Sequence, residues 1–164
     1  MGARYTEKLQ IVPVWAPQVS TVADSETLHV NLDKAHWVSF LVQFGAIATD
    51  SSDAGSIKLY STTASNTTSN AIAQTFRYRL SSAAGTDAWG AITAGTAATG
   101  FVVANTYDNM ALLIDVDPSE ILTLDSDAEF VHLLIDCSLM TGVYASAAAI
   151  IEPRYPQNAN LTSS

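Results

Sequence analysis

The chain has one cysteine, Cys137, few basic residues and no long hydrophobic run. A single cysteine excludes an intramolecular disulfide and a metal site built from several thiolates. Seven Lys and Arg stand against 16 Asp and Glu, and the net charge of −9 argues against binding to nucleic acid or to an anionic membrane. No segment offers the roughly 18 consecutive apolar residues of a membrane-spanning helix. The first residues also lack the pattern of a secretory signal, so we expect synthesis in a cytoplasm.

Charged side chains are scarce and apolar ones are plentiful. Charged residues make up 14% of the chain, against about 25% in ordinary soluble proteins, whereas 48% are hydrophobic. Ser and Thr, which are dense between residues 51 and 68, supply part of the missing polarity. β-branched and aromatic residues recur in blocks, which a disordered chain lacks. The 164 residues are therefore expected to form one folded domain.

Short apolar runs, separated by turn-forming residues, alternate hydrophobic and polar side chains with a period of two. This pattern is typical of an all-β sandwich or barrel. In residues 37–44, every second side chain from Val38 to Phe44 is apolar, which predicts one face buried in a core. We therefore predict an antiparallel, jelly-roll-like β-sandwich. The expected strands are 28–32, 37–44, 56–61, 74–82, 88–93, 101–103, 110–116, 129–138 and 143–151.

Two segments call for a choice between helix and strand. Asp117 can cap a helix that begins with Pro118, so a helical turn is expected there. The alanine-rich residues 145–149 would suit a helix by propensity, but the alternation around them favours a strand. Such small side chains imply a closely packed neighbour, either another strand layer or a second subunit.

Both ends of the chain are apolar and interrupted by proline. Pro13 and Pro17 cannot sit in a central strand, and Pro153 and Pro156 mirror them near the other end. We therefore expect an extended N-terminal arm at 1–27, a sandwich at 28–151 and a C-terminal arm at 152–164. Arms of this kind need a surface on which to lie.

Acidic residues and histidines are the candidates for a metal site. Residues 125–129 alternate carboxylates with other residues, but the glycine and the distant glutamate of a calcium-binding loop are absent. A solvated acidic turn is the favoured interpretation, with cation binding left open. His29, His36 and His132 are far apart in the sequence, each in or beside an expected strand, so we predict no zinc site.

No pattern of a catalytic site is present. No Gly-x-Ser-x-Gly elbow occurs, and Cys137 lies in an expected apolar strand, where a buried, inert thiol is expected. Asp115 and Asp136 could be taken as the paired carboxylates of a glycoside hydrolase, but any acidic protein offers such a pair, so the pair is no evidence of this activity. We predict no catalytic, cofactor-binding or metal-binding residue, no cofactor and no enzyme activity.

Three segments together resemble small virion structural proteins of tailed bacteriophages. They are YTEKLQIVPVWAP at 5–17, WVSFLV at 37–42 and IIEPRY at 150–155. The resemblance is to capsid decoration, or cement, proteins, and it implies a β-rich, non-catalytic protein on the outside of the head. It further implies a homo-oligomer, commonly a trimer, that contacts the major capsid protein after synthesis in the host cytoplasm. A neck or tail position stays open.

Residues of the two arms are the expected contacts with the capsid shell or with neighbouring copies. Trimming the residues before Gln18 should then weaken particle binding and leave the β fold intact. The candidate partner-binding residues are Tyr5, Leu9, Ile11, Val12, Val14, Trp15, Arg154 and Tyr155.

The alternative function is a carbohydrate-binding or receptor-binding module of a phage tail or head fibre. Trp15, Trp89 and Tyr107 lie in or beside irregular segments, where aromatic rings could stack on sugars together with the loop at 51–70. The same rings could equally anchor a subunit contact, because aromatic residues are enriched in protein interfaces.

Overall fold

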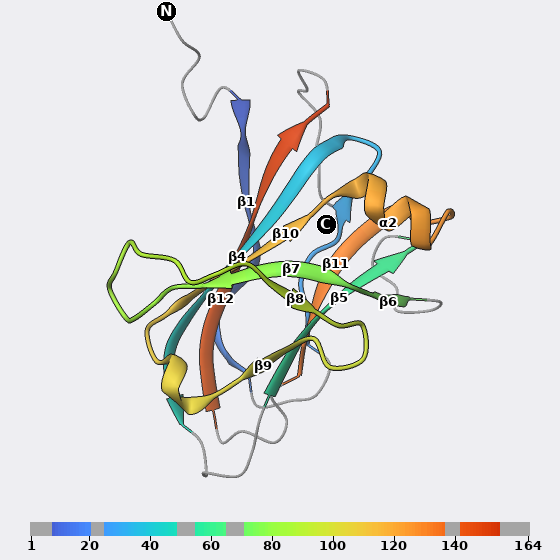
Figure 1. Cartoon of the computed structure of the whole chain (residues 1–164). Coiled ribbons are helices and arrows are strands. Elements are labelled where there is room, and N and C mark those ends of the chain that lie inside the picture. The colour runs from blue at the N-terminus through green and yellow to red at the C-terminus, as the bar shows by residue number, and fades with distance from the viewer. Residues whose placement is uncertain (1–7, 21–24, 49–54, 65–70, 137–141, 155–164) are drawn as a thin grey trace, which may run out of the picture.

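The computed structural model describes residues 8–20, 25–48, 55–64, 71–136 and 142–154, which form two antiparallel β-sheets packed against each other (Figure 1). The predicted all-β sandwich is confirmed. Sheet A has the order β1 (Gln10–Ser20), β12 (Gly142–Pro153), β4 (Ala35–Ala48), β10 (Ala111–Val116), β7 (Phe76–Leu80) and β8 (Thr93–Gly95). In sheet B, β2 (Ser25–Glu26) and β3 (Val30–Asn31) pair with β11 (Phe130–Asp136), which pairs with β5 (Gly55–Thr62); β6 (Ile72–Gln74) and β9 (Phe101–Val103) also pair with β5.

The strand order is that of a jelly roll. The two short strands β2 and β3 together take the place of one strand of that fold. Sheet A then contains β1-β12-β4-β10, and sheet B contains β2-β11-β5-β6. Consecutive strands are thus distributed between the two sheets as in a double Greek key. Thr75 separates β6 from β7, and the chain passes there from sheet B to sheet A. The pair β7–β8 then widens sheet A beyond β10.

The core lies between the sheets and follows the predicted alternation. Val38, Phe40, Val42 and Phe44 of β4 are buried, as are Ile57 and Leu59 of the facing sheet. The alanine-rich segment is a strand, and its alternate residues Ala145, Ala147 and Ala149 are buried in this core. Small side chains suit this position because β12 lies between β1 and β4, with the opposite sheet across the core.

The predicted helix start is also confirmed. The helix α2 (Pro118–Leu124) begins with Pro118 and is capped by Asp117, whose carboxylate accepts a hydrogen bond from the Ser119 backbone N–H at 2.8 Å. Hydrogen bonds from the Ser119 hydroxyl and backbone lower the pKa of Asp117, because they stabilise the carboxylate. A short 3-10 helix, η1 (Asn105–Tyr107), precedes β10. Among the described residues, no helix has the length and apolar character to cross a membrane.

The sandwich begins earlier in the chain than the boundary expected at residue 28. Residues 10–20 of the expected N-terminal arm are β1, which pairs with β12 from Gln10↔Ile151 to Ser20↔Val143. Prolines are tolerated there because β1 is an edge strand, and the register shifts on either side of Trp15. At the other end, Glu152 and Pro153 still belong to β12, and the remainder of the expected C-terminal arm, from 155 onward, lies outside the described residues.

Two expected strands differ from the structure. Of residues 28–32, only Val30–Asn31 is a strand; Val30 and Leu32 are buried as expected, but Leu28 is exposed and His29 is buried, the reverse of the expectation for these two residues. The ladder is interrupted there, because the Leu28 N–H bonds to the Val14 carbonyl of the opposite sheet's edge. Residues 88–92 form a loop with one bridge, Ser81↔Trp89, and β8 starts only at Thr93.

Candidate functional site

The outer face of sheet A is a broad, weakly charged surface. Alternate residues of β4 point away from the core, and Leu41 pairs with Ala148 on one side and with Leu113 on the other. Extending this row, Pro13 of β1 pairs with Ala148, and Arg79 of β7 pairs with Leu113. We call the partly exposed, mainly apolar residues Pro13, Trp37, Ser39, Leu41, Leu113, Ala148 and Ile150 the sheet A patch.

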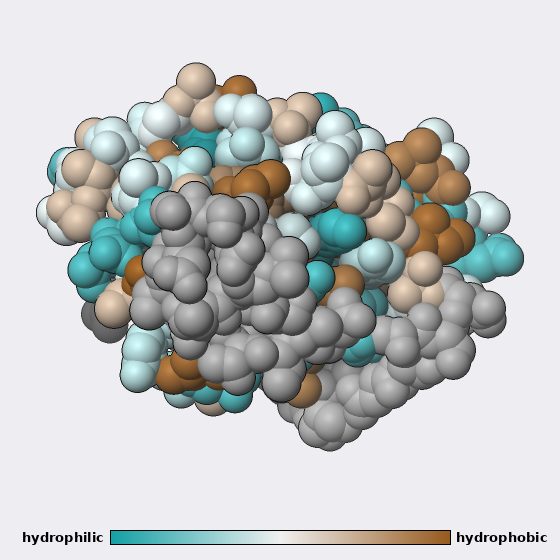
Figure 2. All heavy atoms as spheres, turned by 90° about the horizontal axis from the view of Figure 1, so that it is seen from below, coloured by the Kyte–Doolittle hydropathy of each residue, from teal (hydrophilic) through white to brown (hydrophobic). Residues whose placement is uncertain are grey.

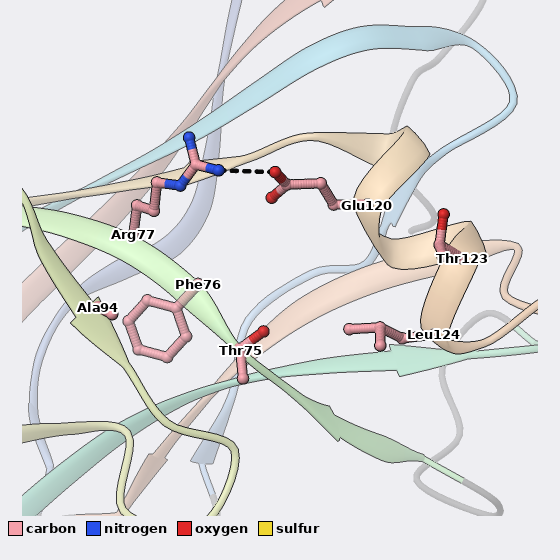
Figure 3. A pocket seen from close by; sticks show the side chains of 7 residues that line it. All are labelled: Thr75, Phe76, Arg77, Ala94, Glu120, Thr123 and Leu124. Atoms are coloured by element: carbon pink, nitrogen blue, oxygen red, sulfur yellow. Dashed lines mark hydrogen bonds and ion pairs between the residues drawn. The ribbon is translucent and has the colours of Figure 1, made fainter.

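Charged groups border this patch. The Ser39 hydroxyl donates a hydrogen bond of 2.7 Å to the Asp115 carboxylate, and Arg77 beside it pairs with Glu120 of α2 at 2.7 Å (Figure 3). Both partners of the Arg77–Glu120 pair are exposed, so solvent screens their attraction. At the other end of sheet A, an open depression of about 400 Å³ lies over β1, β12 and β4, with the exposed ring of Tyr144 in its lining.

A second depression, of about 410 Å³, lies between α2 and strands β7 and β8. Figure 3 shows Phe76 and Thr75 on the strand side and Leu124 on the helix side, with the Arg77–Glu120 pair across one end. Apart from this ion pair, the residues that line the depression carry no ionisable side chain.

The candidate partner-binding residues at positions 9–15 divide between core and surface. Val14 and Trp15 are buried in the hydrophobic core, and Val12 packs against it, so these three side chains offer little surface to a partner. Ile11 is 54% exposed, and Leu9 is half-buried. Removal of all residues before Gln18 would therefore strip most of an edge strand and two core side chains from the sandwich, contrary to the expectation that the fold would remain intact.

The C-terminal candidates have a different environment. Arg154 is exposed, but its Nε donates a 2.9 Å hydrogen bond to the Ala35 carbonyl and its backbone N–H bonds to Lys34, so it holds the end of β12 to the start of β4. Tyr5 and Tyr155 lie outside the described residues.

The aromatic residues considered for glycan binding lie on separate elements. Trp89 is 40% exposed in the loop between β7 and β8. Tyr107 of η1 packs against Phe101, with ring centroids 5.5 Å apart, and is half-buried. Of the segment expected as a loop at 51–70, residues 55–62 form β5, and residues 51–54 and 65–70 lie outside the described residues. Seen from below, hydrophobic residues form separate brown patches among polar ones where the described residues are visible (Figure 2).

The acidic residues of the expected solvated turn differ in their exposure to solvent. Asp127 and Glu129 are exposed, as expected, but Asp125 is buried. Its carboxylate accepts a hydrogen bond of 2.5 Å from the Ser61 hydroxyl, which in turn accepts one of 2.8 Å from the Gln74 amide. Asp125 is thus part of a buried polar network between α2 and sheet B. Asp115 and Asp136 belong to different sheets and do not form a carboxylate pair.

Two of the three histidines, which the sequence separates widely, lie together on sheet B. His29 follows β2, and His132 lies in β11; their rings stack 4.2 Å apart at an interplanar angle of 12°. The carboxylate of Glu26 lies 3.6 Å from Nε2 of His29. One ligand atom of each of these three residues lies within 4.8 Å of the others. We call Glu26, His29 and His132 the histidine cluster.

His132 is fully buried, and neither of its ring nitrogens has a hydrogen-bond partner. Burial, together with the nearby His29, lowers the pKa of His132 to about 3, so its imidazole is neutral at physiological pH. On the other side of the ring lies Tyr60, with centroids 5.9 Å apart. Buried polar atoms without a partner are rare in folded proteins, and each needs an explanation.

No pattern of neighbouring residues in the sequence predicted this cluster. The register of β11 against β3, which sets Val131 opposite Val30, brings the histidines together, and this pairing joins residues far apart in the chain. His36, the third histidine, is exposed on β4, and Cys137 lies outside the described residues. Comparison of the chain with known protein families, with characterised proteins and with solved structures finds no match.

Proposed function

We propose that the protein is a non-enzymatic structural protein of a bacteriophage virion, which decorates and stabilises the capsid exterior by associating with copies of itself and with the major capsid protein. The sheet A patch is the observation that supports this proposal best. Its apolar residues lie in rows across neighbouring strands, which gives a continuous surface that a second copy can cover.

The chemistry of the patch favours a protein partner. Leu41, Leu113 and Ile150 would lose water on association, a gain of roughly 25 cal/mol per Å² of apolar surface buried. Ala148 and Ser39 are small, so another backbone layer can approach closely. The central row carries no charge between Pro13 and Arg79, so little energy is spent on removing water from ions.

The edge of β1 supplies a second contact in this proposal. Ile11 is exposed beside Ile150 and extends the apolar surface to the edge of the sheet. Pro13 and Pro17 lack backbone N–H groups, so β1 is poorly suited to continuous pairing with a strand of another chain. Side chains at this edge, more than backbone hydrogen bonds, would contact the capsid shell.

Capsid binding tests the proposal. Purified protein is mixed with undecorated capsids, and the bound fraction is measured by sedimentation for the wild type, Ile11→Lys and Val102→Lys. Val102 is similarly exposed but lies on β9 of sheet B, so it serves as the matched control. We expect Ile11→Lys to lower the occupancy at least about tenfold and Val102→Lys to leave it unchanged. Absence of wild-type binding, or equal binding by the three proteins, would refute the proposal.

A second candidate is carbohydrate binding, which the exposed indole of Trp89 favours. Ile92 on the same loop is also exposed, so the loop presents an apolar surface on which a sugar ring could stack. A glycan array with the wild type and Trp89→Ala separates the candidates, because decoration of a capsid needs no sugar. Binding that disappears in Trp89→Ala would support this second function.

A further inference from the structure

The histidine cluster combines three features of a metal site. It supplies two imidazoles and one carboxylate within 4.8 Å, it buries the His132 imidazole completely, and it opens to a cavity. The cavity, of about 530 Å³, is lined by residues 13–16 of β1 and by residues 26–29, so Glu26 and His29 face it directly. The Glu26 side chain is 25% exposed, which gives an ion a path from solvent.

The strongest observation in favour of a bound ion is that neither ring nitrogen of His132 has a hydrogen-bond partner. A buried donor or acceptor without a partner destabilises a fold, and here both nitrogens of one ring are in that state. A neutral imidazole nitrogen is the form that binds a metal ion. A metal ion bound to this ring would give a His132 nitrogen the partner that the surrounding protein does not supply.

We propose that Glu26, His29 and His132 bind one divalent transition-metal ion of the zinc class, with water from the adjoining cavity completing its coordination. Two histidines and a carboxylate are a common ligand set for such ions, and three protein ligands leave one position for water in tetrahedral zinc. Calcium and magnesium prefer oxygen ligands, so the set selects against them.

Binding requires one ring to turn. The lone pair of an imidazole nitrogen lies in the ring plane, and the rings are nearly parallel at 12°, so both cannot point at one ion as they stand. Rotation of an imidazole about its Cβ–Cγ bond has broad minima and directs a nitrogen toward the other ligands. The ion therefore replaces the ring stack, and a change in the histidine environment accompanies binding.

The ion would stabilise the edge of sheet B that β2 and β3 form. The strands β2 and β3 have two residues each and pair with β11 over only a few positions. Glu26 and His29 belong to this edge, and His132 belongs to β11, so the ion would cross-link segments far apart in the sequence. This role does not depend on the proposed association through sheet A.

Titration of metal-free protein with Co²⁺ and Zn²⁺ tests the proposal. Protein treated with EDTA and dialysed is titrated by calorimetry, and the Co²⁺ absorption spectrum and the thermal midpoint are recorded. We expect one ion per chain, a rise in the midpoint and d–d absorption bands without the thiolate charge-transfer band that Cys137 would give. Mg²⁺ should produce none of these changes.

Variants locate the site. Glu26→Gln keeps the size of a partly exposed side chain and is expected to weaken binding by roughly tenfold or more, and His29→Gln and His132→Gln by more still. His36→Gln, on the opposite sheet, is the matched control and should bind as the wild type. Circular dichroism checks that each variant folds. If His132→Gln does not fold, the metal affinities of Glu26→Gln and His29→Gln test the proposal. No binding by the wild type, or binding that these variants leave unchanged, would overturn the proposal.

Discussion

Gly95 of β8 lies directly opposite Phe76 of β7, and a Cβ built on Gly95 would stand 2.5 Å from Cζ of the Phe76 ring. The ring is buried in the core and its centroid lies 6.1 Å from that of the Tyr78 ring, so a displacement of the Phe76 ring would disturb this contact. The absence of a side chain at Gly95 therefore leaves room for the Phe76 ring beside the edge strand β8.

Gly95→Ala should destabilise the sandwich. The added methyl group must displace the Phe76 ring, and overpacking of this kind typically costs about 1–3 kcal/mol in the free energy of unfolding. Urea denaturation of the wild type and the variant measures the difference. Ala94→Ser, at an exposed position of the same strand, is the control and should change the value by no more than about 0.5 kcal/mol. Equal stability of Gly95→Ala and the wild type would contradict the packing described here.

Asp117→Ala should destabilise the chain through loss of the α2 cap. Loss of such a cap typically costs about 0.5–2 kcal/mol, and Asp117→Asn, which keeps an acceptor oxygen, should lose less. The folded state lowers the pKa of Asp117 below its ordinary 3.8, so the carboxylate stabilises the fold above that pH and ceases to do so as the pH falls through the folded value. Denaturation at pH 7 and at a pH well below 3.8 should therefore show a smaller difference between the wild type and Asp117→Asn at the lower pH.

Ser61→Ala tests the buried polar network. The substitution leaves the Asp125 carboxylate without its short hydrogen bond and the Gln74 amide without an acceptor. A buried polar group without a partner costs about 1–3 kcal/mol, more if charged. Ser126→Ala, in the adjacent exposed turn, should have almost no effect on the urea midpoint. A loss of stability in both variants, or in neither, would contradict the assigned network.

The stability of metal-free protein should fall in acid because of His132. The unfolded chain binds a proton at this residue near pH 6.5, whereas the folded protein does so only near pH 3. Between these values the unfolded state holds more protons, so each unit of decrease in pH lowers the free energy of unfolding by up to about 1.4 kcal/mol. Glu26, His29 and the Tyr60 ring also face His132 and share the environment.

Denaturation with EDTA at a series of pH values measures this slope. His132→Gln removes the titrating group and should flatten the dependence, whereas His36→Gln should retain it. A wild-type slope equal to that of His132→Gln would show that the burial of His132 does not govern the acid response.

Local patterns in the sequence predicted much of the fold. The apolar alternation from Val38 to Phe44 predicted a core strand, and Asp117 with Pro118 predicted a helix start, because each signal depends on neighbouring residues alone. Residues 10–20 were expected as an arm because prolines exclude a central strand; the position of β1 at the edge of sheet A, where prolines are tolerated, depends on the order of strands.

The candidate sites could not be predicted from the sequence for a related reason. His29 and His132 meet through the register of two strands that are distant in the chain, and no spacing between them carries that information. Likewise, Asp125 looked like part of a solvated turn, but its partners Ser61 and Gln74 come from two strands of sheet B. The sheet A patch arises from one face of each strand, and which face is left uncovered depends on the packing of the two sheets.

The mass of the protein in solution, measured by size-exclusion chromatography with light scattering, tests the association through sheet A most directly. The chain has a mass of 17.4 kDa. We predict a multiple of this mass for the wild type, three chains in the proposed trimer, and a single chain for Leu41→Lys, which places a charge in the centre of the sheet A patch. Val102→Lys should retain the wild-type mass. A single-chain mass for the wild type, or an unchanged oligomer in Leu41→Lys, would contradict the account.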